Sequence, residues 1–328
     1  MQLQPRQYAR RRYLSLCAAL LMAVPFSASG ETNFPSKPIR IIVPTTGGTV
    51  DLIARYLAPK LQDAWGQPVV VDAKPGASGN IAASLVAKSP ADGYTILTGF
   101  NPLAISSFLS RNLTYDLKEL APITLAVSSE QVLVVNADLP VSNLQEFIKL
   151  AKERKGSMNY GSISAGSASH LTMESFKTRA GIDLKHIPYK GAAPALNDLL
   201  GKTTDAGVFA VANVISYVKA GRLKALAVTG SERLKSLPDV PSMAESGLPN
   251  FDATIWIGFL APAGTPTAII DKYNTEMRRI LRNPEMRERI ESADFKVVAS
   301  TPEEFGKFIQ SEIGTWEKVA KQAGAEIN

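Results

Sequence analysis

Two stretches of small and hydroxyl-bearing residues have the composition of an anion site. One is VPTTGGTVD, residues 43–51, and the other is NYGSISAGSASH, residues 159–170. Each follows a strand-like run and precedes a helix-like run. A helix start offers unpaired N–H groups and partial positive charge, glycine lets a ligand approach the backbone, and Ser and Thr add donors. The alternative for one stretch alone is a tight turn with serine caps, but two such stretches favour ligand binding.

Other chemistries find less support in the sequence. A third glycine-rich stretch, residues 74–83, is expected to be a turn. The only histidines are His170, which opens a helix and could cap it or contact ligand, and His186, which we expect to be packed within a strand. With one spare histidine and no cysteine after the first 30 residues, we expect no metal cluster and no cofactor. The sequence also lacks the G-x-S-x-G nucleophile motif.

One enzyme class stays open as an alternative, an exported protein that binds a nucleotide cofactor. Gly47 and Gly48 would open its first helix, and Asp72 at the end of the second strand would bind the ribose. Against this reading, the G-x-G-x-x-G spacing is absent, because Asp51 and Leu52 follow where glycine is needed.

The elements that would position these residues alternate between strand-like and helix-like runs. Such alternation predicts βαβ units on a mostly parallel sheet. Ligands bind such sheets outside the carboxyl ends of the strands, where both small-residue stretches fall. Residues 236–252 are rich in Pro, Gly and Ser and predict a loop that could connect two lobes.

The first 30 residues predict a cleaved export leader, with a basic front, an apolar run from Tyr13 to Phe26 and small residues behind it. Arg10–Leu14 leaves twin-arginine and ordinary secretory export both open. The one cysteine, Cys17, follows Leu16, which is too large for a lipoprotein cleavage site. Removal of four arginines lowers the net charge from +6 to +2 (6 − 4 = 2), so we expect no nucleic-acid binding.

Longer segments resemble the Bug family, the extracytoplasmic solute receptors of tripartite tricarboxylate transporters. The resemblance covers nearly the whole chain after the leader. It rests on the segments FPSKPIRIIVP, GGTVDLIAR, GQPVVVDAKPGASGNIAA, NYGSISAGSASHL, IDLKHIPYKGAAPALNDLL and VKAGRLKALAVTGSERLKSLPDVPSMAESGLP.

The resemblance implies an α/β protein of the periplasmic binding protein type 2 class, with two α/β lobes and a ligand cleft between them. We expect one lobe over residues 31–130 plus 254–328 and the other over residues 131–253. The implied protein is a monomeric periplasmic receptor, cleaved near residues 28–31, that catalyses no reaction. Its partners would be a small carboxylate and the membrane subunits of a transporter, with an orphan or signalling receptor as the alternative.

Two loops clamp the ligand carboxylate in the family, and they fall on 45–51 and 162–170 of this sequence. The predicted ligand-binding residues come from these two loops, with Phe100, Phe209 and Ala210 added. They are Thr45, Thr46, Gly47, Gly48, Thr49, Asp51, Phe100, Ser162, Ser164, Ala165, Gly166, Ser167, Ser169, His170, Phe209 and Ala210.

Three departures from the family pattern bear on the ligand. The first loop is one residue shorter, with Thr45 where phenylalanine is common. Ala210 replaces an acid that would suit an ammonium group, which argues against an amino-acid ligand. The loop expected after YTIL lacks the usual threonines, and its Phe100 could stack on a ligand ring. We therefore expect a carboxylate without an amino group, aliphatic or aromatic, such as an aromatic dicarboxylate flanked by Phe100 and Phe209.

Overall fold

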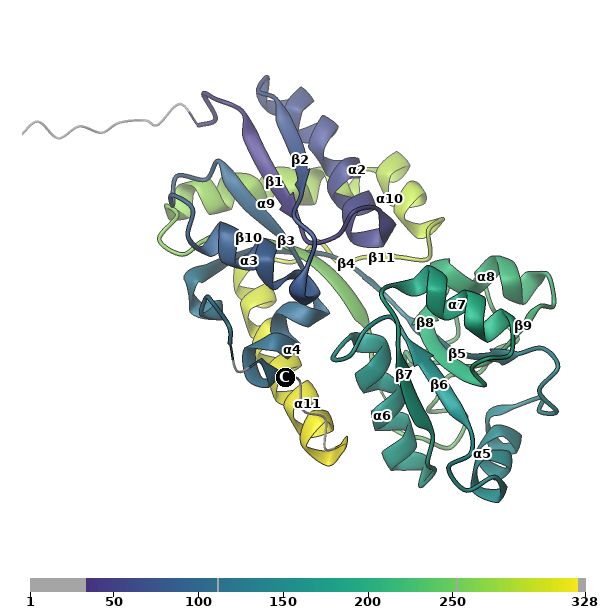
Figure 1. Ribbon diagram of the computed structural model, residues 1–328. Helices are drawn as coiled ribbons and strands as arrows, with labels where there is room; N and C mark the ends of the chain where they lie inside the picture. Colours follow the sequence, from purple (N-terminus) through teal and green to yellow (C-terminus); the bar gives the residue numbers. More distant parts are fainter. Residues whose placement is uncertain (1–33, 111, 252, 324–328) are drawn as a thin grey trace, which may run out of the picture. The chain divides into compact units, whose positions relative to one another are not determined.

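Two mixed β-sheets with surrounding helices form the framework of the chain (Figure 1). This computed structural model describes residues 34–110, 112–251 and 253–323. Both sheets belong to one compact unit, Pro35–Asn328. The predicted export leader and Cys17 lie outside the described residues.

The first sheet has the strand order β11-β4-β10-β3-β1-β2. Its strands are β1 (Ile39–Val43), β2 (Val69–Ala73), β3 (Thr95–Phe100), β4 (Leu120–Ser129), β10 (Ile255–Pro262) and β11 (Lys296–Val297). β1 pairs with β2 and β3 in parallel, whereas β10 lies antiparallel between β3 and β4. Figure 1 shows this green strand from late in the sequence among blue strands from early in it.

The second sheet has the strand order β7-β6-β8-β5-β9. Its strands are β5 (Gln131–Asn136), β6 (Asn159–Ser162), β7 (Lys185–Pro188), β8 (Ala206–Ala210) and β9 (Leu223–Val228). β6 is parallel to β7 and β8, and β5 is antiparallel to β8 and β9. The prediction of mostly parallel sheets was therefore wrong, because the strands that enter each sheet after a crossing run in the opposite direction.

Helices follow most of the strands. They are α2 (Gly48–Trp65), α3 (Asn80–Ala87), α4 (Asn101–Leu109), α5 (Leu144–Glu153), α6 (Ala168–Ala180), α7 (Ala192–Leu200), α8 (Val211–Lys219), α9 (Thr267–Arg282), α10 (Pro284–Glu291) and α11 (Pro302–Ala323). Short 3-10 turns occupy Ala77–Gly79 and Leu117–Glu119. The expectation of a loop after YTIL was wrong, because Thr98–Phe100 complete β3 and α4 begins at Asn101.

Helix α11 links the cores of the two sheets. Phe305 and Ile309 on this helix pack in the first core with the fully buried Trp256, whereas Trp316 packs in the second core. That second core also contains Phe147 and Phe176, whose rings stack 6.2 Å apart. The amphipathic pattern of one long helix therefore contributes apolar side chains to both halves of the fold.

Two connections join the sheets, and they meet at Gln131. The first is Glu130 alone, between β4 and β5, and the second runs over residues 229–254 between β9 and β10. Gln131 N–H donates to Thr229 Oγ1 at 3.0 Å, and Thr229 Oγ1 donates to the carbonyl of Ala253 at 3.1 Å. The two connections are thus tied together by hydrogen bonds.

Candidate functional site

A cavity of about 490 Å³ is lined by residues that belong to both sheets and their helices. That volume is in the range of small-molecule sites. Most of its wall is built where a strand of the parallel part of a sheet ends and the next helix begins. The lining residues are Thr45–Val50, Phe100–Pro102, Gln131, Ile163, Ser167–Ser169, Lys190–Pro194, Phe209, Ala210, Asn213 and Ile255–Ile257.

The N-termini of five described helices, α2, α4, α6, α7 and α8, contribute to this wall. The first turn of a helix has N–H groups without an intrahelical partner and carries partial positive charge. In α2, α4, α7 and α8 no side chain caps these groups, since the N-cap residues are Gly47, Phe100, Gly191 and Ala210. Their free N–H groups are therefore available to an anion.

Fixed charge on the cavity wall has one sign. Lys190 is the single charged residue among the described lining residues, and no acidic side chain is among them. Lys190 is exposed and forms no ion pair with any described residue. Together with the helix N-termini, this distribution favours an anionic occupant over a cationic one.

The β1–α2 loop presents bare backbone. Gly47 and Gly48 have φ angles of 72° and 75°, a conformation that favours glycine. A Cβ atom at either position would meet no atom within 4 Å. The open side of this backbone explains the paired glycines, which leave room for close approach of a ligand. Thr45 Oγ1 donates to the Gly47 carbonyl at 3.1 Å and steadies the loop.

The second small-residue loop is only partly on the wall. Ser167 and Ser169 line the cavity, but Ser162, Ser164, Ala165, Gly166 and His170, all predicted ligand residues, do not. The hydroxyls bond mostly within the loop: Ser167 Oγ donates to the Ser164 carbonyl at 2.7 Å, and Ile163 N–H donates to Ser169 Oγ at 3.1 Å. Several serines thus hold the shape of the loop.

Two histidines lie beneath this loop. The Gly166 N–H donates to His170 Nδ1 at 3.0 Å, and His186 Nε2 lies 2.7 Å from Ser162 Oγ. Burial lowers the pKa of His170, and burial together with nearby His170 and Lys177 lowers the pKa of His186 to about 3. Both rings are therefore neutral at pH 7, as acceptance by His170 Nδ1 requires.

The two predicted aromatic residues both line the cavity. Phe100 is the last residue of β3 and the N-cap of α4, and it is half-buried. Phe209 is 1% exposed on β8, and Ala210 follows it as the N-cap of α8. Apolar rings therefore stand on two parts of the wall, beside the helix N-termini.

Two acids named from the sequence do not line the cavity. Asp51, in the first turn of α2, is 5% exposed, and its Oδ2 accepts from Arg55 Nε at 2.6 Å. Asp72 at the end of β2 pairs with Arg40 at 2.6 Å and with Lys74 at 3.0 Å, and these hydrogen bonds lower its pKa. The acid that the nucleotide alternative needs is thus already paired with two cations.

The cavity includes polar residues that the sequence did not indicate, namely Asn101, Gln131, Lys190 and Asn213. Lys190 precedes Gly191, between β7 and α7. It could have been found by applying the strand-end rule to that junction as well. Gln131 begins β5 and Trp256 lies in β10, and no local signal in the sequence marks either of them.

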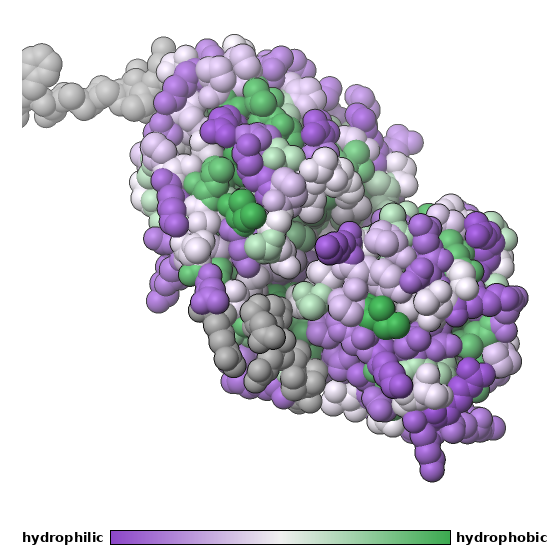
Figure 2. Space-filling view, viewed as in Figure 1, coloured by the Kyte–Doolittle hydropathy of each residue, from purple (hydrophilic) through white to green (hydrophobic). Residues whose placement is uncertain are grey.

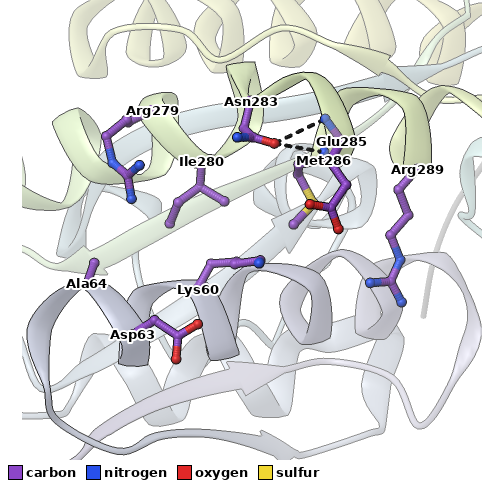
Figure 3. Close-up of a pocket in the computed structure, with 9 residues that line it drawn as sticks. All are labelled: Lys60, Asp63, Ala64, Arg279, Ile280, Asn283, Glu285, Met286 and Arg289. Atoms are coloured by element: carbon purple, nitrogen blue, oxygen red, sulfur yellow. Dashed lines mark hydrogen bonds between the residues drawn. The ribbon is translucent and has the colours of Figure 1, made fainter.

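A second hollow, of about 290 Å³, lies between α2, α9 and α10 (Figure 3). Lys60 and Asp63 face Arg279, Glu285 and Arg289 across it, so both signs of charge are present. The side chain of Asn283 in this hollow accepts hydrogen bonds from Glu285 N–H and Met286 N–H and so caps α10. This mixed groove is a poorer anion site than the cavity.

On the face in Figure 2, hydrophobic residues form separate small patches among hydrophilic ones. No helix in the described ranges is long and apolar enough to cross a bilayer. Those residues also hold no group of three His, Cys, Asp or Glu side chains that could bind a metal ion.

Known proteins resemble this chain over most of its length. A family described as "Tripartite tricarboxylate transporter family receptor" matches residues 53–325. Protein BugT of Bordetella pertussis (strain Tohama I) is 37% identical over 310 residues, which are 93% of this chain and 94% of BugT.

Solved structures agree with this match. R. palustris Rpa4515, solved with adipate, superposes with a TM-score of 0.83 at 34% identity, covering 90% of this chain and 100% of that one. MatC from Rhodopseudomonas palustris, with bound malate, gives a TM-score of 0.77 at 29% identity, covering 87% and 99%. The expected fold, two α/β lobes of the periplasmic binding protein class, is confirmed. The chain belongs to the Bug family, the solute-binding receptors of tripartite tricarboxylate transporters.

Proposed function

We propose that this chain binds a small carboxylate in the periplasm and delivers it to the membrane subunits of a tripartite tricarboxylate transporter. One observation carries the proposal: five described helix N-termini meet at a cavity whose described lining includes Lys190 and no acidic side chain. Such a wall suits the binding of a carboxylate.

The ligand in this proposal lacks an amino group. A buried ammonium group needs an anionic partner, and the position that could supply one is Ala210. Phe100 and Phe209 suit an apolar or aromatic body between the polar ends. The adipate of Rpa4515 and the malate of MatC are dicarboxylates without amino groups, and they support this class.

Ligand capture would occur by closure of two lobes, residues 31–130 plus 254–328 and residues 131–253. Glu130 and the segment 229–254 would act as the hinge. The working form would be a monomer, released after cleavage of residues 1–30. The proposed ligand residues are those named from the sequence that line the cavity, with Lys190 and Asn213 added.

Thermal unfolding of the chain from residue 31 tests this proposal against succinate, adipate, phthalate and benzoate, with aspartate as the amino counterpart. A ligand at one hundred times its Kd stabilises the folded state by about 2.7 kcal/mol. We expect stabilisation by at least one amino-free carboxylate and none by aspartate. Stabilisation by aspartate alone would overturn the ligand class, and no response to any carboxylate would overturn the function.

A matched pair of charge variants tests the site. Lys190→Gln removes the cation at the cavity and should weaken carboxylate binding about tenfold. Lys60→Gln removes a cation that is also exposed, in the separate hollow of Figure 3, and should leave binding unchanged. Equal effects of the two variants in calorimetry would place the ligand elsewhere.

A further inference from the structure

Gln131 is a buried polar side chain on the cavity wall. It is 1% exposed and stands first in β5, directly after the single-residue connection from β4. Its backbone is fixed from both sides, since Gln131 N–H donates to Thr229 Oγ1 at 3.0 Å and Thr229 N–H donates to the Gln131 carbonyl at 2.9 Å. The side chain therefore starts from a fixed point.

Both amide protons of Gln131 are used within the protein. Nε2 donates to Thr172 Oγ1 and to the Ala253 carbonyl, each at 2.9 Å. A carbonyl oxygen only accepts, so the nitrogen must face Ala253 and the orientation of the amide is determined. Oε1 accepts a hydrogen bond from no residue that the structure describes.

Other polar side chains on the wall differ from Gln131. Asn101 Oδ1 accepts from Trp256 N–H at 3.0 Å, so its acceptor is used. Asn213 is half-buried, where water can hydrate it. Oε1 is not fully enclosed, so water in the cavity can reach it, and a ligand that displaces this water must supply a donor in its place. Gln131 Oε1 thus calls for a donor from the occupant of the cavity.

We infer that the ligand carries a hydroxyl group beside its carboxylate, and that Gln131 Oε1 accepts its hydrogen bond. An ionised carboxylate has no proton to donate. An ammonium group could donate but would lack a carboxylate partner among the described lining residues. A hydroxyl donates without charge, so a hydroxycarboxylate fits both Gln131 and the helix N-termini. This inference rests on the proposed function and narrows its ligand class.

Matched ligands that differ by one hydroxyl test the inference. Calorimetry would compare succinate with malate, adipate with 2-hydroxyadipate, and benzoate with 2-hydroxybenzoate on the chain from residue 31. For a skeleton that binds, we expect the hydroxylated member to bind about tenfold tighter. Equal affinities within every pair that binds would overturn the inference, because water could then satisfy Oε1 equally well. That result would leave the proposed function, a carboxylate receptor, unaffected. Absence of binding by all six would overturn both.

Two variants distinguish recognition of the ligand hydroxyl by Gln131 from a general disturbance of the connections between the two sheets. Gln131→Met keeps the length of the side chain but has no amide oxygen, so the preference within a pair should fall to about one. Thr229→Val breaks the same crossing but retains Oε1, and it should weaken both members equally and keep their ratio. If Gln131→Met does not fold, the wild-type pairs decide the question. A preference that persists in a folded Gln131→Met protein would overturn the inference.

Discussion

The imidazole rings of His170 and His186 stack face to face, with centroids 3.9 Å apart and planes 10° apart. The Tyr160 ring lies beside both, with centroid distances of 5.0 Å to His186 and 6.5 Å to His170, and its hydroxyl donates to Glu174. Lys177, paired with Glu174 at 2.8 Å, is the nearby cation. A proton on either ring would therefore add positive charge beside another aromatic ring and a lysine in a partly buried place.

This arrangement predicts acid sensitivity in a particular pH window. The pKa of His186 is about 3 in the folded chain and about 6.5 in the unfolded chain, so between these values the unfolded state binds more protons. The contribution of neutral His186 to the free energy of unfolding should be fully present above pH 6.5 and should fall as the pH drops below that value. Melting temperatures from pH 7.5 to 4.5 measure this effect, which begins about two pH units above the ordinary pKa of a carboxyl group.

The control for that prediction is His186→Gln. Glutamine can still bond to Ser162 but does not titrate, so the decline between pH 6.5 and 4.5 should become shallower. An unchanged decline would mean that other groups cause it.

Backbone exposure at Gly47 predicts a loss of affinity from one methyl group. Gly47 has φ 72° and ψ −172°, a region that glycine adopts almost alone, so Gly47→Ala should lower the unfolding free energy by about 1–3 kcal/mol. It should also weaken carboxylate binding, because the methyl group occupies the open side of the loop. Gly66→Ala, at the other end of α2 with φ 66° and ψ 14°, places alanine in the left-handed helical region and should affect stability alone. Urea unfolding and calorimetry on both variants would check this, and equal affinities would contradict the placement of the ligand.

Asp51 should affect stability rather than binding. Asp51→Asn removes the charge that pairs with Arg55 and that favours the first turn of α2, and we expect a loss of about 1 kcal/mol. Because Asp51 is off the cavity wall, the Kd for a carboxylate should change less than twofold. A large change in Kd at unaltered stability would return Asp51 to the site.

Glu312 ties α11 to the cavity wall. Its Oε2 accepts from Trp256 Nε1 and Trp316 Nε1, each at 2.9 Å, and from Asn101 Nδ2 at 3.3 Å. Glu312→Ala would remove the acceptor of these donors and should cost about 3 kcal/mol in urea unfolding. Glu317→Ala, on the same helix with an exposed ion pair to Lys321, should cost less than about 1 kcal/mol. Similar losses would contradict the role of Glu312.

The sequence alone was sufficient for the elements that local patterns determine. Strand-like runs followed by small residues and helix-like runs predicted where β1 gives way to α2 and β6 to α6, and residues from both junctions line the cavity. Composition could not show which serines point outward. Ser162 and Ser167 are of one type and five residues apart, but their hydrogen bonds inside the loop are set by three-dimensional geometry.

Other features depended on contacts between distant segments. β10 reads as a strand in the sequence, but its place between β3 and β4 and its antiparallel direction follow from tertiary pairing. Gln131 follows Glu130 in an unremarkable run, and its neighbours Thr172 and Ala253 are 41 and 122 residues away. Helix α4 falls in the run after YTIL that was expected to be a loop, and its Pro102 is well tolerated because it stands in the first turn of the helix.

The place of β10 in the first sheet has a consequence for how the chain acquires its structure. Residues 39–129 supply β1 to β4, but β3 and β4 do not pair with each other, and each pairs with β10 (residues 255–262), which lies between them. The second sheet, from residues 131–228, needs no strand from outside that span. During synthesis the later sheet can therefore be completed first, while the earlier one waits with two open strand edges. Such edges pair readily with other chains, so a chain that stops before residue 255 should aggregate.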